Sequence, residues 1–221
     1  MSRIINYGLI GYTGKMGREI INLFSEKGHV CVYKKDIDSE ELIQKPEILI
    51  DFSLSSGLND TINRASEYNV PLIIGTTALK EDQIQSLVKL GEKIPVVQSY
   101  NFSIGIQMFL KAVDLYRNYI SDWDTELIEV HHRYKKDKPS GTALMIQRAF
   151  GREIPISSQR IGGVFGDHSI TFGNDGETIS ISHRAISRRA FTEGVLKSAH
   201  FVLEKDKGFF TFKDVIFNGE N

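Results

Sequence analysis

The chain has 221 residues, of which 41% are hydrophobic and 25% charged, a composition that excludes a disordered protein. Its length suits one large domain or two small ones, and a formal net charge of −1 gives no bulk attraction to nucleic acid. Cys31 is the only cysteine, so no intrachain disulfide can form and a reducing compartment is favoured. The sequence shows neither a signal-peptide pattern nor an apolar run of the roughly 20 residues that span a bilayer, and we therefore expect a cytoplasmic protein.

The first half of the chain alternates short apolar runs with helical patterns. We expect strands at residues 4–10, 30–33, 47–52, 70–74 and 95–98, and helices at residues 14–27, 56–68 and 80–90. The run at residues 48–50 is apolar at every position, as in a strand that is buried on both faces. Strands that alternate with helices predict a parallel sheet with crossover helices.

The pattern changes after Tyr100. We expect helices at residues 105–120, 140–150 and 191–204, and strands at residues 123–134, 159–165, 168–172 and 177–183. Residues 103–187 therefore read as an α+β domain with a mostly antiparallel or mixed sheet. The last helix resembles those of the first half, so residues 1–102 and 188–221 are expected to form the other domain.

A glycine-rich turn follows the first expected strand and opens a helix. It reads Gly11-Tyr12-Thr13-Gly14-Lys15-Met16-Gly17. Backbone amides at such a helix start point toward a pyrophosphate, and glycine allows the backbone to approach it closely. The spacing is G-x-x-G-x-x-G rather than G-x-G-x-x-G, so a turn without a ligand remains the alternative.

The end of the second strand is where an adenosine ribose is expected. Asp36 lies 19 residues after Gly17, close to the place of an acid that binds the ribose hydroxyls of NADH. Lys34 and Lys35 can instead hold the 2′-phosphate of NADPH. We therefore expect the chain to use both cofactors, with a modest preference for NADPH. The alternative is that these three charged residues form a solvated strand end that binds no cofactor.

Two polar segments follow later strands of the same expected sheet. They are Gly75-Thr76-Thr77 and Ser99-Tyr100-Asn101-Phe102. Ligands in open α/β sheets bind beyond the carboxyl ends of the strands, so both segments are candidates to line the nicotinamide end of the cofactor.

The most distinctive segment is a basic loop that runs into a helix start, with the sequence EVHHRYKKDKPSGTA from Glu129 to Ala143. Histidine titrates near neutral pH and can transfer protons. Ser140, Gly141 and Thr142 supply amides and hydroxyls at a helix N-terminus, a place that binds anions. The segment therefore suits an acidic small molecule such as a dicarboxylate.

This loop has three other possible interpretations. Adjacent histidines on a strand point to opposite faces and no Cys or His cluster completes a ligand set, so we expect no metal. A G-x-S-x-G elbow is missing, which disfavours a serine hydrolase. A solvated basic loop remains the alternative. A second basic run holds His183, a candidate for simple packing, and cations of open role: Arg184, Arg188 and Arg189.

The segment from Glu129 to Ala143 resembles the signature of the dihydrodipicolinate reductases, E-x-H-H-x-x-K-x-D-x-P-S-G-T-A. The resemblance covers essentially the whole chain and is greatest to the short bacterial forms. It implies a Rossmann-like, parallel-sheet dinucleotide-binding domain and an α+β domain that binds substrate and builds a homotetramer. The implied reaction reduces a cyclic hydroxy-imine dicarboxylate with NADPH or NADH.

The resemblance also implies residue roles. His131 becomes the acid/base residue and Lys135 the proton donor, while substrate carboxylate is bound by His132, Gly141 and Thr142. The implied cofactor contacts are Gly11 to Met16, Gly75 to Thr77 and Ser99 to Phe102. Since His131 and Lys135 would lie about 13 Å apart on an extended strand, both can meet one substrate only if the chain turns after His132.

Two features depart from the family. Lys138 stands where alanine is usual, and Lys34 and Lys35 replace the acidic–basic pair of some members. The alternatives are another two-domain NAD(P)-dependent dehydrogenase of amino-acid metabolism, of the aspartate or homoserine type, and a redox sensor that binds NAD(H) without catalysis.

Overall fold

The computed structural model describes residues 3–217, which form two compact units: residues 3–102 with 191–217, and Ser103–Ala190. Among the described residues, no helix is both long and apolar enough to cross a membrane.

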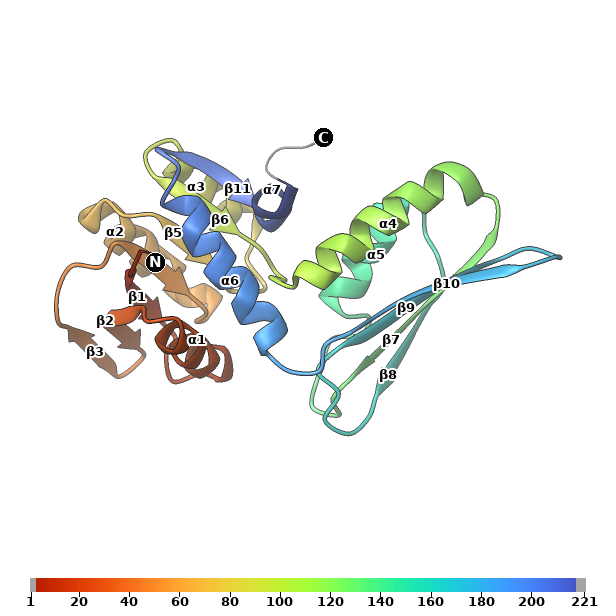
Figure 1. Ribbon diagram of the computed structural model, residues 1–221, viewed down its shortest axis with the longest axis horizontal. Helices are drawn as coiled ribbons and strands as arrows, with labels where there is room; N and C mark the ends of the chain where they lie inside the picture. Colours follow the sequence, from red (N-terminus) through yellow and green to blue (C-terminus); the bar gives the residue numbers. More distant parts are fainter. Residues whose placement is uncertain (1–2, 218–221) are drawn as a thin grey trace. The chain divides into compact units, whose positions relative to one another are not determined.

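The first unit contains a seven-stranded sheet (Figure 1). Its strands are β1 (Asn6–Ile10), β2 (Val30–Asp36), β3 (Ser39–Leu42), β4 (Ile48–Asp51), β5 (Leu72–Ile74), β6 (Pro95–Gln98) and β11 (Gly208–Thr211). Their spatial order is β11-β6-β5-β4-β1-β2-β3, and each pairing is parallel except that of β2 with β3. From β1 the chain adds β2 on one side and then crosses to β4 on the other, which is the topological switch point of a Rossmann-type sheet.

Helices cover both faces of this sheet. They are α1 (Lys15–Glu26), a 3-10 turn η1 (Ser55–Gly57), α2 (Leu58–Tyr68), α3 (Glu81–Gly91), α6 (Arg189–Val202) and α7 (Phe212–Phe217). Apolar side chains of α1, α6 and α7 form one core with the strands, and those of α2 and α3 form a second. The residues of β4 are buried throughout, as the apolar run predicted for a central strand.

The second unit contains a four-stranded mixed sheet (Figure 1). Its elements are α4 (Ile104–Ile120), β7 (Asp124–His131), α5 (Gly141–Phe150), β8 (Ile156–Arg160), β9 (Asp167–Gly173) and β10 (Thr178–Arg184). The strand order is β10-β9-β7-β8, with β7 and β8 parallel and the other pairs antiparallel. Phe109 and Val113 of α4 and Ile146 of α5 pack on the inward-facing residues of one sheet face, Leu127 and Phe172 among them. The α/β class with a mixed second sheet is thus confirmed.

Some expected elements were wrong. The strand expected at 159–165 is β8, which starts at Ile156 and ends at Arg160, because residue pairing with β7 ends there and Gly162 takes a left-handed φ of 53°. The strand expected at 123–134 ends at His131. The sequence analysis missed β3, β11 and α7, which are short and mostly exposed or partly exposed, so they lack a clear hydrophobic period.

Candidate active site

A cavity of about 520 Å³ lies at the carboxyl ends of β1, β2 and β4, where the sheet topology places a ligand. Its lining residues are Ile10, Gly11, Thr13, Gly14, Lys35, Asp36, Ile37, Phe52, Ser53, Leu54, Ser56, Gly57 and Asp60. Four of the predicted cofactor-binding residues are in this set: Gly11, Thr13, Gly14 and Lys35. The hydroxyl of Ser53 is buried without a hydrogen-bond partner among the described residues, so the lining keeps a polar group available for a ligand.

The glycine-rich turn is tightly closed. The amide of Gly14 donates to the carbonyl of Gly11 at 3.2 Å, and a Cβ at Gly17 would lie 2.3 Å from that same oxygen. No side chain caps α1 at Gly14, so the helix start offers its amides to an anion. Lys15 and Met16 open α1, and the Tyr12 hydroxyl lies 3.0 Å from that of Ser39. These features fit a pyrophosphate cradle.

The end of β2 carries the charges that the sequence left ambiguous. Asp36 accepts the amide of Thr13 at 3.1 Å, and its hydrogen bond with the Thr13 hydroxyl is the largest cause that lowers its pKa. The ammonium group of Lys35 lies 3.0 Å from Glu40 and 3.5 Å from Asp60. Lys34 instead pairs with Glu41 at 3.7 Å. Lys35 and Asp36 therefore line the cavity, and acidic partners offset part of the Lys35 charge.

We expect Lys35→Ala to lower kcat/KM with NADPH about fivefold and to leave NADH nearly unchanged. The magnitude corresponds to about 1 kcal/mol, the range of a partly exposed and partly neutralised ion pair. Lys34→Ala is the matched control, because that lysine pairs with Glu41 and is not among the residues that line the cavity. Steady-state kinetics with both cofactors measure the effect, and an equal loss with NADH and NADPH would show that Lys35 does not read the 2′-phosphate.

The other predicted cofactor segments follow β5 and β6. Thr76 is buried, and its hydroxyl donates to Asp51 at 3.1 Å. Asp51 also accepts the Thr61 hydroxyl at 2.6 Å, so it ties the end of β4 to α2. Thr77 is exposed, and a Cβ at Gly75 would clash with the Phe52 ring.

The segment after β6 combines buried and exposed residues. The Ser99 hydroxyl donates to the carbonyl of Asn101 at 2.8 Å, while Tyr100 is 45% exposed. The ring of Phe102 is buried, with its centroid 5.7 Å from that of Phe52 and 5.1 Å from that of Phe212. Phe102 and Thr76 thus support the edge of the sheet, and Thr77 and Tyr100 are the exposed candidates for cofactor contact.

The second unit gathers the basic signature around one buried carboxylate. Glu129, near the end of β7, is 0% exposed and contacts Nδ1 of His131. Its other oxygen accepts from the Arg160 guanidinium at 2.8 Å and from the amide of Ser140 at 3.3 Å. His168 of β9 stacks edge-on against His131, with 5.2 Å between ring centroids.

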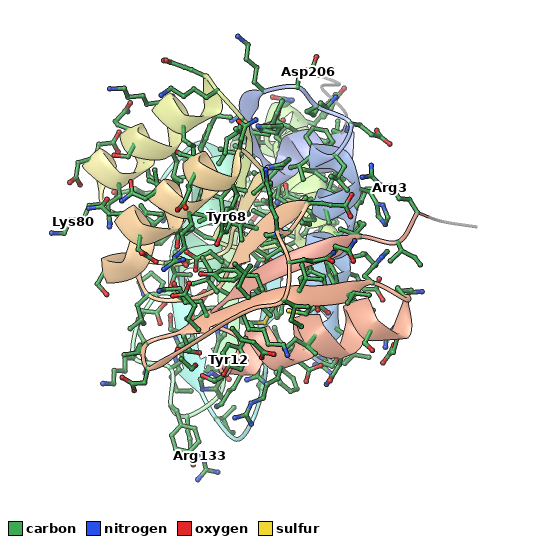
Figure 2. All side chains as sticks on the ribbon, turned by 90° about the vertical axis from the view of Figure 1, so that its left-hand side faces the viewer. Arg3, Tyr12, Tyr68, Lys80, Arg133 and Asp206 are labelled. Carbon is green, nitrogen blue, oxygen red and sulfur yellow. The ribbon has the colours of Figure 1, made fainter. Side chains whose placement is uncertain are left out.

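The chain turns directly after the end of β7. β7 ends at His131, and the amide of Lys135 then donates to the carbonyl of His132 at 3.1 Å. Arg133 projects from this turn into solvent (Figure 2). Lys135 is partly buried and pairs with Asp137 at 2.9 Å. The tight turn brings Lys135 back toward the end of β7. His131 and Lys135 are therefore not separated as they would be on an extended strand, and both can belong to one site.

The helix start after the turn has the predicted form. Ser140 is the N-cap of α5, and its hydroxyl accepts the amide of Ala143 at 3.1 Å. Gly141 and Thr142 are the first two residues of α5, and the amide of Gly141 donates a hydrogen bond to the carboxylate of Asp137. Nδ1 of His132 is buried without a hydrogen-bond partner among the described residues. The helix start therefore already binds the carboxylate of Asp137, and Nδ1 of His132 is a buried nitrogen that is available to a ligand.

Burial and charge set the protonation states. Burial opposes ionisation of Glu129, but hydrogen bonds from Arg160, Ser158 and His131 lower its pKa to about 2. Burial lowers the pKa of His131 and outweighs the opposing hydrogen bond from Glu129. Burial likewise lowers the pKa of His168 to about 3. At neutral pH the carboxylate is therefore ionised and both imidazoles are mainly neutral.

Glu129, His131 and His168 also come close enough to hold a metal ion, since one ligand atom from each lies within 4.8 Å of the others. The sequence analysis overlooked this cluster because His168 comes from a strand far along the chain. The Arg160 guanidinium already pairs with the same carboxylate, and a second cation there would be repelled.

The second basic run contacts other residues of the second unit. Nε2 of His183 lies 3.2 Å from the Ser103 hydroxyl, which fits the packed-histidine interpretation. Arg184 pairs with Asp167 at 2.8 Å. The Arg188 guanidinium lies over the Phe165 ring at 5.1 Å, and Arg189 begins α6.

Sequence reasoning missed several site residues. Glu129 was named only as part of the signature, and Arg160 lay in the strand expected at residues 159–165 without a role. A buried acid in an alternating strand, at the position of Glu129, was the available signal, because such an acid needs a partner. Ser53 and Asp60 were not considered, although the segment after β4 lies at the carboxyl end of a central strand.

A chain that combines a Rossmann-type unit with a glycine-rich cradle and a second unit with a buried His and a Lys is a two-domain NAD(P)H-dependent oxidoreductase. The family descriptions "Dihydrodipicolinate reductase, N-terminus" and "Dihydrodipicolinate reductase, C-terminus" match residues 31–102 and 105–216. The chain belongs to the dihydrodipicolinate reductase family.

Individual relatives agree with this assignment. The 4-hydroxy-tetrahydrodipicolinate reductase of Thermosipho africanus is 47% identical over 214 residues, which cover 96% of this chain and 98% of the relative. The enzyme of the same name from Zymomonas mobilis is 37% identical, covering 96% and 97%. A dipicolinate-bound dihydrodipicolinate reductase from Paenisporosarcina superposes with a TM-score of 0.80 at 25% identity, covering 95% of this chain and 98% of that one. The cofactor of the chain is accordingly NADPH or NADH.

Proposed function

We propose that the chain reduces 4-hydroxy-2,3,4,5-tetrahydrodipicolinate to 2,3,4,5-tetrahydrodipicolinate with loss of water, a step of lysine and diaminopimelate biosynthesis. One NAD(P)H and one proton are consumed per turnover, and NAD(P)⁺ and water are released. The observation that carries the proposal is the junction of the basic turn with the start of α5, where His131, Lys135 and Thr142 belong to one short segment.

The residues have distinct proposed tasks. The helix start at Ser140, Gly141 and Thr142, with the His132 imidazole, binds carboxylate and so orients the ring. Lys135 donates a proton, and His131 acts as the acid/base residue. The cofactor supplies the hydride, and the turn that contains Gly11 to Met16, with Lys35, binds its phosphates and ribose.

The direct test is a coupled assay in which the substrate is made in situ and oxidation of NADPH or NADH is followed by absorbance. Turnover that depends on the substrate supports the proposal. Oxidation of aspartate or homoserine by NAD(P)⁺ in its place would favour an amino-acid dehydrogenase, and cofactor binding without turnover would favour a sensor. Neither alternative is favoured by the comparisons, since relatives matched along nearly the whole chain are reductases.

We expect pyridine-2,6-dicarboxylate to inhibit competitively with the substrate, because it offers two carboxylates on a flat ring but no reducible imine. The same compound, dipicolinate, is bound in the Paenisporosarcina reductase. Inhibition should weaken as ionic strength rises, since part of the binding is charge pairing. No inhibition at millimolar concentration would contradict a cyclic dicarboxylate site.

We expect Thr142→Val to raise the substrate KM about tenfold to a hundredfold and to leave the cofactor KM nearly unchanged. Loss of one hydrogen bond to a charged group costs about 1.5–3 kcal/mol. Thr178→Val, the same exchange at an exposed residue of β10, is the control and should change neither constant. A loss confined to the cofactor would place the carboxylate site elsewhere.

We further propose a homotetramer in the cytoplasm, built by the second unit. The face of its sheet opposite α4 and α5 is open and carries Ile128, which is 39% exposed. Hydroxyl pairs Ser169–Ser182 and Thr171–Ser180 lie on the same face, so it is polar without being strongly charged. Sedimentation equilibrium tests the proposal, with a mass four times that of one chain as the expected result.

A further inference from the structure

Glu129 is the anion around which the proposed proton-transfer site is assembled. Its side chain is fully buried, and both of its carboxylate oxygens accept hydrogen bonds. One oxygen contacts Nδ1 of His131, and the other accepts from Arg160 at 2.8 Å and from the backbone amide of Ser140 at 3.3 Å. A single carboxylate therefore joins the imidazole on β7, the guanidinium on β8 and the start of α5.

We propose that Glu129 is the positioning residue of this site: its carboxylate accepts the Nδ1 proton of His131 and leaves Nε2 as the atom that exchanges a proton with the substrate. The inference rests on the proposed function, because it concerns the acid/base role of His131. An acid that orients an imidazole in this way selects its tautomer without taking the proton itself.

The surroundings of Nε2 support this assignment. A Cβ at Gly166 would lie only 3.1 Å from Nε2, so the backbone beside this nitrogen leaves no room for a side chain. Nδ1, by contrast, is already in contact with Glu129. Of the two ring nitrogens, Nε2 is thus the one that remains for the reaction.

The electrostatics point the same way. The charged and titratable groups that face the imidazole are Glu129 from β7, Lys135 from the turn, Arg160 from β8 and His168 from β9. Burial, Lys135 and Arg160 all lower the pKa of His131, whereas Glu129 raises it. Without the carboxylate, the imidazole would be harder to protonate and free to adopt the other tautomer.

Glu129 also links proton transfer to carboxylate binding. The amide it accepts belongs to Ser140, whose hydroxyl caps α5 at the proposed carboxylate site. A substitution at Glu129 should therefore affect kcat first and the substrate KM second, while cofactor binding is unchanged.

The test compares Glu129→Gln with the double variant Glu129→Gln/Arg160→Gln. His131 and Arg160 contact different oxygens of Glu129, and glutamine replaces one of these oxygens with an NH₂ donor, so the single variant loses one of the two contacts. An unpaired buried guanidinium can prevent folding. The double variant removes both charges, and its two amides can hydrogen-bond to each other. Glu126→Gln is the control, an exposed acid of the same strand that accepts the Ser157 hydroxyl at 2.7 Å.

We expect the double variant to fold and bind NADH normally, and to lose about tenfold to a hundredfold in kcat at neutral pH. The limb of the kcat–pH profile that reports His131 should move to lower pH, because the lost hydrogen bond and charge of Glu129, which raise the pKa of His131, outweigh the lost Arg160 charge, which lowers it. If Glu129 only neutralised Arg160, the double variant would recover the original kcat and pH profile, and the inference would be overturned.

The tautomer can be measured without turnover. In the folded protein, ¹⁵N NMR of histidine, assigned with His131→Gln, should show the Nδ1–H form of His131 in the unsubstituted chain and a mixture in the double variant. An Nε2–H form in the unsubstituted chain would overturn the inference. An inactive chain with the expected tautomer would instead contradict the proposed function, so the two failures are distinguishable.

Discussion

His131→Gln and Lys135→Ala should each lower kcat by about 10²–10⁴-fold, the usual contribution of one general acid or base. Both side chains are placed where a proton can be moved: His131 ends β7 with its Nδ1 fixed by Glu129, and Lys135 lies on the turn that follows. The ion pair of Lys135 with Asp137 is partly exposed, so its loss should cost little stability.

Three measurements test this prediction. Circular dichroism and thermal melting establish the fold, calorimetry measures NADH binding, and the coupled assay gives kcat. Lys136→Ala, an exposed neighbour on the same turn, is the control and should retain most of the activity. If kcat fell only about twofold in both His131→Gln and Lys135→Ala, the assignment of the site would be wrong.

Gly17→Ala should weaken NADH binding by about 10–100-fold or more. The new Cβ would lie 2.3 Å from the carbonyl oxygen of Gly11 and 2.7 Å from Cα of Tyr12, and both are backbone atoms that cannot rotate away. The turn must therefore open, which withdraws amides from the pyrophosphate. Each lost hydrogen bond to the charged pyrophosphate costs about 1.5–3 kcal/mol of binding free energy. Overpacking by the new methyl group costs about 1–3 kcal/mol of folding stability.

Calorimetric titration with NADH and a thermal melt separate the two effects. Gly57→Ala adds the same methyl group to another residue that lines the cavity, but its Cβ would meet only the Ser53 hydroxyl at 3.7 Å, an ordinary contact. We expect this control to keep the melting temperature of the unsubstituted chain. Normal NADH affinity in Gly17→Ala would show that the turn does not bind the pyrophosphate.

Local patterns were sufficient for much of the fold. The glycine turn, the apolar run of β4 and the Ser140 cap each depend on residues close together in sequence, and each was predicted where it occurs. Short edge strands such as β3 and β11 were missed, because their stability comes from a neighbouring strand rather than from their own apolar period.

The charges at the end of β2 show the limit of local reasoning about a site. The sequence placed two lysines and an aspartate together and left their competition open. Tertiary structure brings Glu40 and Asp60 to Lys35, and Glu41 to Lys34, and it commits Asp36 to Thr13. Each of these ion pairs and hydrogen bonds changes the net charge that would act on a 2′-phosphate.

The sequence by itself determined the family, the α/β class and the His131–Thr142 segment, because a signature of contiguous residues needs no folding to be recognised. Only the tertiary structure decided that Glu129, Arg160 and His168 surround His131, since these residues come from three different strands. The reason is physical: the pKa and tautomer of a buried imidazole depend on charges a few ångströms away in space, and pairing between strands, rather than spacing along the chain, sets those distances.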